Sequence, residues 1–126
     1  MKIGIFAKTF NRPTTEELFQ AIASYRIYSV QFNLSCAGIE TLPGNVSSDQ
    51  VQRILNSAQS ATVELSAISG TFNMAHPDPG VRRDNLMKFE VLCEVTVRLR
   101  ILVITLCTGT RDSANMWKWH SENDSK

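Results

Sequence analysis

The feature that most constrains the fold is an alternation of apolar, strand-like runs with amphipathic helical segments. The apolar runs begin near residues 2, 28, 63 and 101, so three complete units span 99 residues, or 33 each. Strands that alternate with helices form parallel sheets with right-handed crossovers. The sequence therefore predicts an α/β fold in the order βαβαβαβ, with four strands and three helices.

Three segments have the apolar spacing of an amphipathic helix. Capping boxes that start at Thr14 and Ser47 are expected to begin the first two helices, and Asp78 before a proline is expected to begin the third. The predicted buried faces are Leu18, Ile22 and Tyr25, then Val51, Ile54, Leu55 and Ala58, and then Leu86, Phe89, Cys93 and Val97. The strands between these helices are almost continuously apolar, which predicts a sheet covered on both faces.

Two arginines stand where a helix turns into the next strand. Arg26 and Arg100 occupy positions that favour glycine, because the residue after a helix often has a positive φ. An arginine takes that conformation at a cost of about 1 kcal/mol. The alternative is a different turn in which each arginine stabilises the helix C-terminal dipole.

The repeat length relates the chain to a barrel. Eight units of this size would need roughly 264 residues, which is the size of a (β/α)8 barrel, and the chain has 126. We therefore expect one partial domain over residues 1–126, corresponding to half of a barrel, with residues 107–126 as a polar tail or loop after the fourth strand. Such a chain is expected to be a fragment of the complete enzyme.

Composition excludes several function classes. The formal net charge is +1, so no bulk field attracts nucleic acid or an anionic membrane. No apolar stretch reaches the length of a membrane span, and the N-terminal apolar run is too short for a secretion signal. The spacing of Cys36, Cys93 and Cys107 fits neither a disulfide framework nor a zinc site. These features predict a soluble cytoplasmic protein.

Candidate site residues follow the predicted strands, because parallel α/β proteins bind ligands at the carboxyl ends of their strands. The candidates are Asn33, Asn73, His76 and Arg111. For His76 the alternative is a loop histidine that hydrogen-bonds the next helix. For Arg111 it is a surface ion pair with Asp112 or Glu122. Residues 116–120, Met-Trp-Lys-Trp-His, fit either a sugar-pocket wall or an apolar patch that packs on another surface.

Other motifs carry little chemistry. The chain has neither a phosphate-binding P-loop nor a dinucleotide fingerprint. Cys107 and Arg111 have the residue types of a phosphatase loop, but the three residues between them are too few to surround a phosphate. The tripeptide His76–Asp78 occurs in J-domain co-chaperones between two helices, whereas here a strand-like run precedes it.

Three stretches resemble the sugar phosphate isomerase/epimerase family of the xylose isomerase-like TIM barrel superfamily. They are residues 30–35 (VQFNLS), 69–78 (SGTFNMAHPD) and 104–112 (ITLCTGTRD), each at a predicted strand end. The resemblance extends from Lys2 to about His120. It implies a (β/α)8 barrel that interconverts ketoses and aldoses, or epimerises sugars, in carbohydrate metabolism.

The resemblance also implies a mechanism and a set of site residues. A divalent metal (Mn, Mg, Zn or Co) acts as a Lewis acid on the substrate, and a carboxylate transfers the proton through an enediolate. The metal ligands of the family are largely in the second half of the barrel, so this chain is expected not to coordinate the metal fully and its catalytic residues are unknown. His76 matches a substrate- or metal-facing position, while Asn33, Asn73 and Arg111 match substrate-binding positions for a sugar or sugar phosphate.

Two alternatives belong to other function classes. A non-catalytic half-barrel has two unpaired edge strands and can form a homodimer in which eight strands close a ring. A small flavodoxin-like binding domain is the third possibility, and it needs a fifth strand and covering helices that the polar tail does not supply.

Overall fold

The computed structural model describes residues 3–124 and confirms the alternating α/β order. The strands are β1 (Gly4–Phe6), β2 (Ser29–Phe32), β3 (Glu64–Ser69) and β4 (Ile104–Thr105). The α-helices are α1 (Thr15–Ser24), α2 (Ser48–Ser60) and α3 (Pro79–Arg98), and short 3-10 helices are η1 (Ala7–Thr9), η2 (Leu34–Ala37) and η3 (Ser121–Asp124). None of the helices within residues 3–124 has both the length and the apolar character needed to cross a bilayer.

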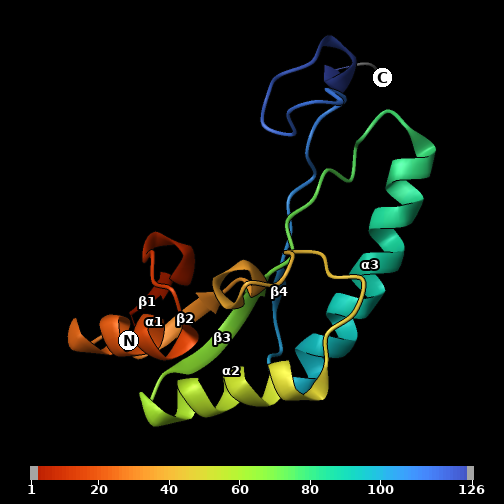
Figure 1. Cartoon of the computed structure of the whole chain (residues 1–126). Coiled ribbons are helices and arrows are strands. Elements are labelled where there is room, and N and C mark those ends of the chain that lie inside the picture. The colour runs from red at the N-terminus through yellow and green to blue at the C-terminus, as the bar shows by residue number, and fades with distance from the viewer. Residues whose placement is uncertain (1–2, 125–126) are drawn as a thin grey trace.

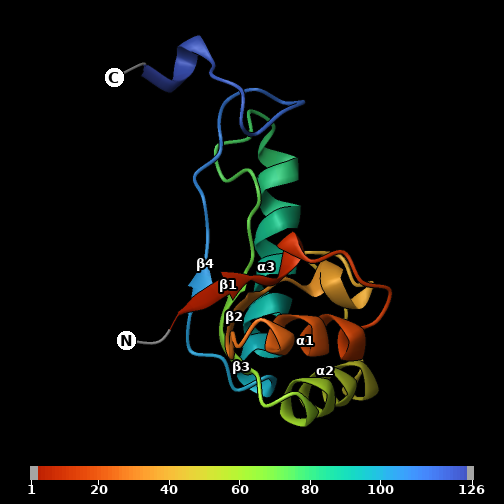
Figure 2. The ribbon, with the colours of Figure 1, turned by 90° about the vertical axis from the view of Figure 1, so that its left-hand side faces the viewer.

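The four strands form one parallel sheet in the order β1-β2-β3-β4. Each connection moves to the next strand in the same direction, and right-handed crossovers then place all three helices on one face. Figures 1 and 2 show α1 and α2 side by side on that face, with α3 beyond them behind β4. A β-bulge between Val30 and Gln31 shifts the register of β2 against β3.

The core fills the space between this face and the helices. Phe19 of α1 stacks against Phe32 of β2, with 5.7 Å between the ring centroids, and both side chains are fully buried. Ile54 of α2 and Ile68 of β3 continue the same core. Burial of these apolar side chains is the main force that holds the helices on the sheet.

No helix within residues 3–124 covers the opposite face of the sheet, and several polar side chains lie on it. Gln31 of β2 reaches across β3, and its Nε2 donates to Thr105 Oγ1 of β4 at 2.7 Å. Ser29, two residues before Gln31, is only half-buried, whereas the alternating Val30 is fully buried. The prediction of a sheet covered on both faces is therefore wrong for residues 3–124. The strands are apolar toward the helices, and toward the open face they carry polar side chains together with Phe6, which is in register with Gln31.

The buried face of α3 also differs from the predicted one. Leu86 is 54% exposed and Val97 is 75% exposed, whereas Leu92 and Val95 are buried. Apolar side chains surround α3, so two different stripes match a helical period. Packing decides between them: Leu92 lies so close to Gly70, which follows β3, that a Cβ atom on Gly70 would overlap it.

The fourth strand is shorter than the predicted run of residues 101–106. β4 pairs only with Ile68 and Ser69, the last two residues of β3. Ile101 completes the cap of α3, since its N–H donates to the Thr96 carbonyl at 3.0 Å. Leu102 follows at 96% exposed, outside the sheet.

The helix starts agree with the capping signals. The Ser47 hydroxyl accepts from the Gln50 N–H at 3.2 Å and the Gln50 side chain accepts from the Ser47 N–H at 2.9 Å, which completes the predicted capping box. Thr14 accepts from the Glu17 N–H, so the first helix shows the hydroxyl half of its box. Asp78 caps α3 as predicted, with its Oδ1 2.7 Å from a backbone nitrogen in the first turn.

All three helix-to-strand turns contain a non-glycine residue in the left-handed region. The φ values are 59° for Arg26, 57° for Thr62 and 59° for Arg100. Arg26 and Arg100 therefore have a positive φ, which was one of the two alternatives predicted for them. Thr62 has the same conformation, which the sequence analysis did not identify. After α3, the Arg100 N–H donates to the Val97 carbonyl at 3.0 Å, which together with the Ile101 bond forms a Schellman motif.

Replacing Arg100 with glycine is expected to raise the free energy of unfolding by about 1 kcal/mol, because glycine adopts a positive φ without strain. Urea denaturation followed by far-UV circular dichroism measures the change. Arg83, exposed within α3, supplies the matched control: Arg83→Gly should lower stability by about 1 kcal/mol. If both variants lower the free energy of unfolding, the positive φ of Arg100 is not a source of strain in the parent protein.

Candidate functional site

The sequence-predicted site residues lie in two places. Asn33 directly follows β2 and is part of the buried sheet end. Asn73, His76 and Arg111 instead lie in a lobe made of two segments, residues 71–78 after β3 and residues 106–124 after β4, which are joined by several hydrogen bonds. Figures 1 and 2 show this lobe projecting past the carboxyl ends of β3 and β4.

Asn33 connects three parts of the backbone and is 2% exposed. Its Nδ2 donates to the Ser69 carbonyl at the end of β3 at 3.2 Å. Its Oδ1 accepts from the Ser35 N–H at 2.9 Å and from the Thr41 hydroxyl at 3.0 Å. Both the nitrogen and the oxygen of the Asn33 amide are therefore hydrogen-bonded within the protein. The side chain thus stabilises the joined ends of β2 and β3.

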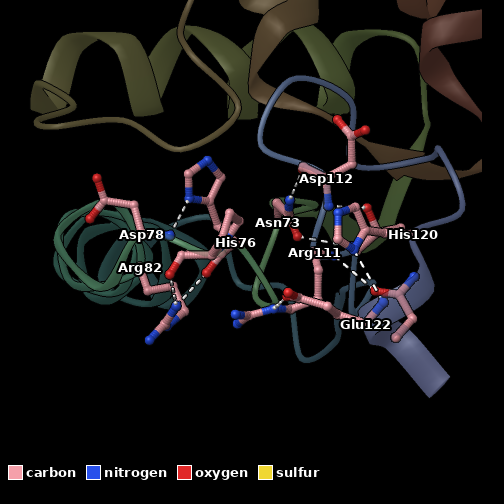
Figure 3. Close-up of polar contacts among 11 residues, drawn as sticks. Asn73, His76, Asp78, Arg82, Arg111, Asp112, His120 and Glu122 are labelled. Atoms are coloured by element: carbon pink, nitrogen blue, oxygen red, sulfur yellow. Dashed lines mark hydrogen bonds and ion pairs between the residues drawn. The ribbon is translucent and has the colours of Figure 1, made fainter. Parts of the chain in front are cut away.

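Asn73 is the link between the two segments of the lobe. Its Nδ2 donates to the Asp112 carbonyl at 3.2 Å, and its Oδ1 accepts from the Thr110 N–H at 3.0 Å. Nearby, the Ala75 N–H donates to the Thr108 carbonyl at 3.0 Å. The side chain therefore positions the loop after β4 against the loop after β3 (Figure 3).

Gly109 is a lobe residue that the sequence analysis did not identify. Its φ is +75°, and a Cβ atom there would overlap Asn73 Oδ1 and lie 2.9 Å from Asn73 Cα. Only glycine satisfies both the backbone conformation and the close approach. The sequence signal that could have identified this position is the glycine at the centre of residues 107–111, Cys-Thr-Gly-Thr-Arg.

His76 is held by the start of α3, as Figure 3 shows, and also by the other segment of the lobe. Its Nδ1 accepts from the Asp78 N–H at 3.1 Å, and its Nε2 lies 3.3 Å from the Ser113 carbonyl. These partners require the neutral tautomer with its hydrogen on Nε2. Arg82 of α3 donates to the His76 and Pro77 carbonyls and fixes the same turn. His76 thus hydrogen-bonds the next helix, which was the alternative interpretation of this residue.

Arg111 forms the surface ion pair that was the alternative to ligand binding. Its Nε lies 3.3 Å from Glu122 Oε2, and its backbone N–H donates to Asn123 Oδ1 at 2.9 Å. Lys118 pairs in a similar way with Asp112, at 3.5 Å. The first of these contacts joins residue 111 to η3 (Figure 3).

Asp112 orders the turn that follows it. Its Oδ1 accepts from the Asn115 N–H at 2.8 Å and from the Ala114 N–H at 2.9 Å. These backbone donors, Asn115 first, lower the pKa of the carboxyl group, and Lys118 adds to the effect. A lowered pKa stabilises the folded lobe above the ordinary carboxyl pKa, and this contribution is lost as the pH falls through the folded value.

The lobe is therefore expected to loosen on acidification, starting below about pH 4 and not between pH 5 and 7. Tryptophan fluorescence anisotropy is a direct measurement, because both tryptophans of the chain, Trp117 and Trp119, lie in the lobe. Asp112→Asn removes this titration and serves as the control, so its acid response should be smaller. An identical acid transition in both proteins would show that Asp112 does not cause it.

Several hollows are lined by residues outside the two segments of the lobe, among them one of about 420 Å³ beside α3. One of about 590 Å³ is at the amino ends of the strands, between α2, β3 and the turn from α3 to β4, and is lined by residues such as Leu55, Leu65 and Leu102. Another of about 230 Å³ lies between α1 and α2 beside Glu16. There the Glu16 backbone N–H, and then the Ser57 hydroxyl, lower the pKa of the Glu16 carboxyl group. The Glu16 contacts join α1 to α2 at this hollow.

The described residues do not fit a divalent metal. Within residues 3–124, no three His, Cys, Asp or Glu side chains gather as a ligand set. His76, the candidate metal ligand, directs both ring nitrogens at backbone groups. Cys36, Cys93 and Cys107 form no disulfide and are half-buried, and burial raises the pKa of the Cys36 thiol.

Comparison of the chain with family models, with curated proteins and with solved structures gave no match. The resemblance to sugar phosphate isomerases and epimerases therefore stays a prediction. The α/β class is shown by the structure, as a four-stranded parallel sheet with three helices.

Proposed function

We propose that this chain forms the first half of a sugar-binding (β/α)8 barrel of the sugar phosphate isomerase/epimerase type. The observation that supports this most is the sheet, whose parallel strands follow one another in chain order with the helices on one face. Closed barrels are built by repeating this step. A flavodoxin-like sheet has the order 2-1-3-4-5, with helices on both faces, so the strand order disfavours the small-domain alternative.

The face of the sheet that no helix within residues 3–124 covers supports the same proposal. In a closed barrel this face lines the interior, and the loops at the carboxyl ends of the strands surround the substrate. Gln31 and Thr105 supply amide and hydroxyl groups to that face. The lobe extends from the carboxyl ends of β3 and β4, where such a barrel binds its ligand. Asn73 and His76 act there by positioning backbone rather than by reaching into an open pocket.

The proposed reaction moves a proton between adjacent carbons of a sugar or sugar phosphate through an enediolate. The described residues lack a fitting metal-ligand set. In this proposal, the metal ligands and the proton-transferring carboxylate come from strands other than β1 to β4. The chain contributes half of the substrate-binding wall and the lobe.

The test begins with the encoded message beyond codon 126. We expect further βα units with Glu, Asp and His at strand ends, and a protein that contains them should interconvert ketose and aldose phosphates with Mn²⁺. Residues 1–126 alone should show no turnover above buffer. Robust turnover by residues 1–126, or an inactive protein despite the additional units, would contradict the proposal.

A second candidate function is self-association, and the exposed edges of the sheet favour it. In the described part of the chain β1 and β4 each pair on one side only. Exposed apolar side chains flank them, with Ile3 69% exposed before β1 and Leu102 96% exposed before β4. Because the two edges are parallel, β4 of one copy can pair with β1 of a second, and the same contact repeats around a two-fold axis.

Sedimentation velocity distinguishes this candidate from a monomeric half-barrel. Self-association predicts a species of twice 14.1 kDa, and Leu102→Asp beside β4 should dissociate it. Leu86→Asp is the matched control, since Leu86 is 54% exposed on α3 and outside both edges. A monomer at all concentrations, or equal dissociation by both variants, would remove this candidate.

A further inference from the structure

The hollow of about 590 Å³ at the amino ends of the strands is formed by α2, β3 and the turn from α3 to β4. It opens because β4 pairs only with Ile68 and Ser69, so within residues 3–124 the first half of β3 has no strand beside it on that side. Ile101 bonds instead to the end of α3. Figures 1 and 2 show the chain passing from there to β4 apart from the start of β3. The hollow therefore lies at the edge of the sheet opposite to the lobe.

The lining of this hollow is largely apolar. It includes Leu55 of α2, Leu65 of β3, and Leu102 and Val103 before β4. Leu102 is 96% exposed and Val103 is 50% exposed, and removing such apolar surface from water is favourable. Pockets for small molecules have volumes of about 300–1,000 Å³ and mostly apolar walls with a few polar groups. The hollow thus suits a small ligand with an apolar body.

Arg100 gives the hollow its one cationic side chain. The residue is exposed, and within residues 3–124 its guanidinium forms no hydrogen bond and no ion pair. The lining also contains one carboxylate, that of Glu64. Glu64 precedes Leu65, which packs against the core, and successive side chains of a strand point to opposite faces. The Glu64 side chain is therefore directed to the other face of the sheet, and Arg100 remains available to an anionic group.

The backbone of Arg100 adds a second observation. Its φ of 59° strains an arginine, whereas glycine adopts it freely. Residues held in this region of φ cluster at ligand clamps, where the side chain compensates for the strain. Arg26, after α1, has the same φ and is not among the residues that line the hollow. A comparison of the two arginines therefore separates the guanidinium from the conformation.

We propose that this hollow binds a small aliphatic carboxylate. Its hydrocarbon chain covers Leu55, Leu65 and Leu102, and its carboxylate binds the Arg100 guanidinium, which can donate two parallel N–H bonds to it. A cationic ligand is repelled by Arg100, and an uncharged one does not use it. The site is separate from the sugar-binding edge, so it neither requires nor supports the proposed isomerase.

The experiment is an NMR titration of the ¹⁵N-labelled chain with octanoate. We expect saturable shifts of the Leu65 and Val103 amides with a Kd of about 1 mM, and none of the Asn73 and Gly109 amides in the lobe. Acetate, which has the carboxylate without the chain, should give no saturable shift. The proposal is overturned if octanoate gives no saturable shift, if its shifts are confined to the lobe, or if acetate binds as well as octanoate.

Two glycine variants test the role of the guanidinium. Arg100→Gly and Arg26→Gly each remove an arginine with a positive φ, so neither is expected to lower stability. Arg100→Gly should weaken octanoate binding about fivefold and leave the binding of 1-octanol, the uncharged analogue, unchanged. Arg26→Gly should change neither. Unchanged octanoate affinity in Arg100→Gly, an equal loss for 1-octanol, or an equal loss in Arg26→Gly would overturn the proposal.

Discussion

Replacing Asn33 with alanine is expected to lower the free energy of unfolding by about 3 kcal/mol. The asparagine is 2% exposed, and its amide bonds the Ser69 carbonyl, the Ser35 N–H and the Thr41 hydroxyl. Removing it leaves these groups without their partner at the joined ends of β2 and β3. A buried polar group without a partner costs more than the net gain of making its hydrogen bond.

Urea denaturation measures this loss of stability, and two further variants serve as comparisons. Thr41→Val removes one of the three bonds and should cost about 1 kcal/mol. Asn45→Ala changes an exposed asparagine in the loop before α2 and should stay within about 0.5 kcal/mol of the parent. If Asn33→Ala has normal stability but loses sugar binding, the substrate-binding role implied by the resemblance is correct and the structural role is wrong.

The fold could be predicted because its determinants are local. The alternation of strand and helix patterns gave the parallel sheet, and Ser47 and Asp78 marked helix starts through contacts within one turn. The stripe of α3 that is buried could not be predicted, because two stripes fit the helical period and contact between Leu92 and Gly70 selects one of them. Thr62 was missed for another reason. A threonine carries no sequence signal for a positive φ, which the Schellman geometry of the turn imposes.

The positions of the candidate site residues could be predicted from the sequence, but the roles of their side chains could not. Asn33, Asn73 and His76 do lie at the carboxyl ends of strands, as the parallel topology requires. Their polar groups, however, are aimed at backbone atoms far away in the sequence, such as the Ser69 and Asp112 carbonyls. Periodicity places a residue along a strand or loop and does not specify these long-range partners.

The second large effect is expected at Gly109, where alanine should detach the two segments of the lobe at a cost of about 3 kcal/mol. An alanine at φ +75° costs about 1 kcal/mol. Its Cβ would displace the Asn73 amide, which then loses its bonds to Thr110 and Asp112, at about 1 kcal/mol each. The sheet and its core contain none of these atoms, so the loss is confined to the lobe.

Hydrogen exchange tests this at single amides. The Ala75 and Thr110 amides, which bond across the two segments, should lose protection in Gly109→Ala, while the Ile68 amide in the sheet keeps it. Gly44→Ala is the matched control, because a Cβ there meets nothing within 4 Å. Asn73→Ala should have the same effect as Gly109→Ala, and the double variant should lose little more than either single variant, because both act on one contact. Additive losses would mean that the two residues stabilise the lobe independently, and unchanged protection in Gly109→Ala would show that the close approach to Asn73 does not hold the segments together.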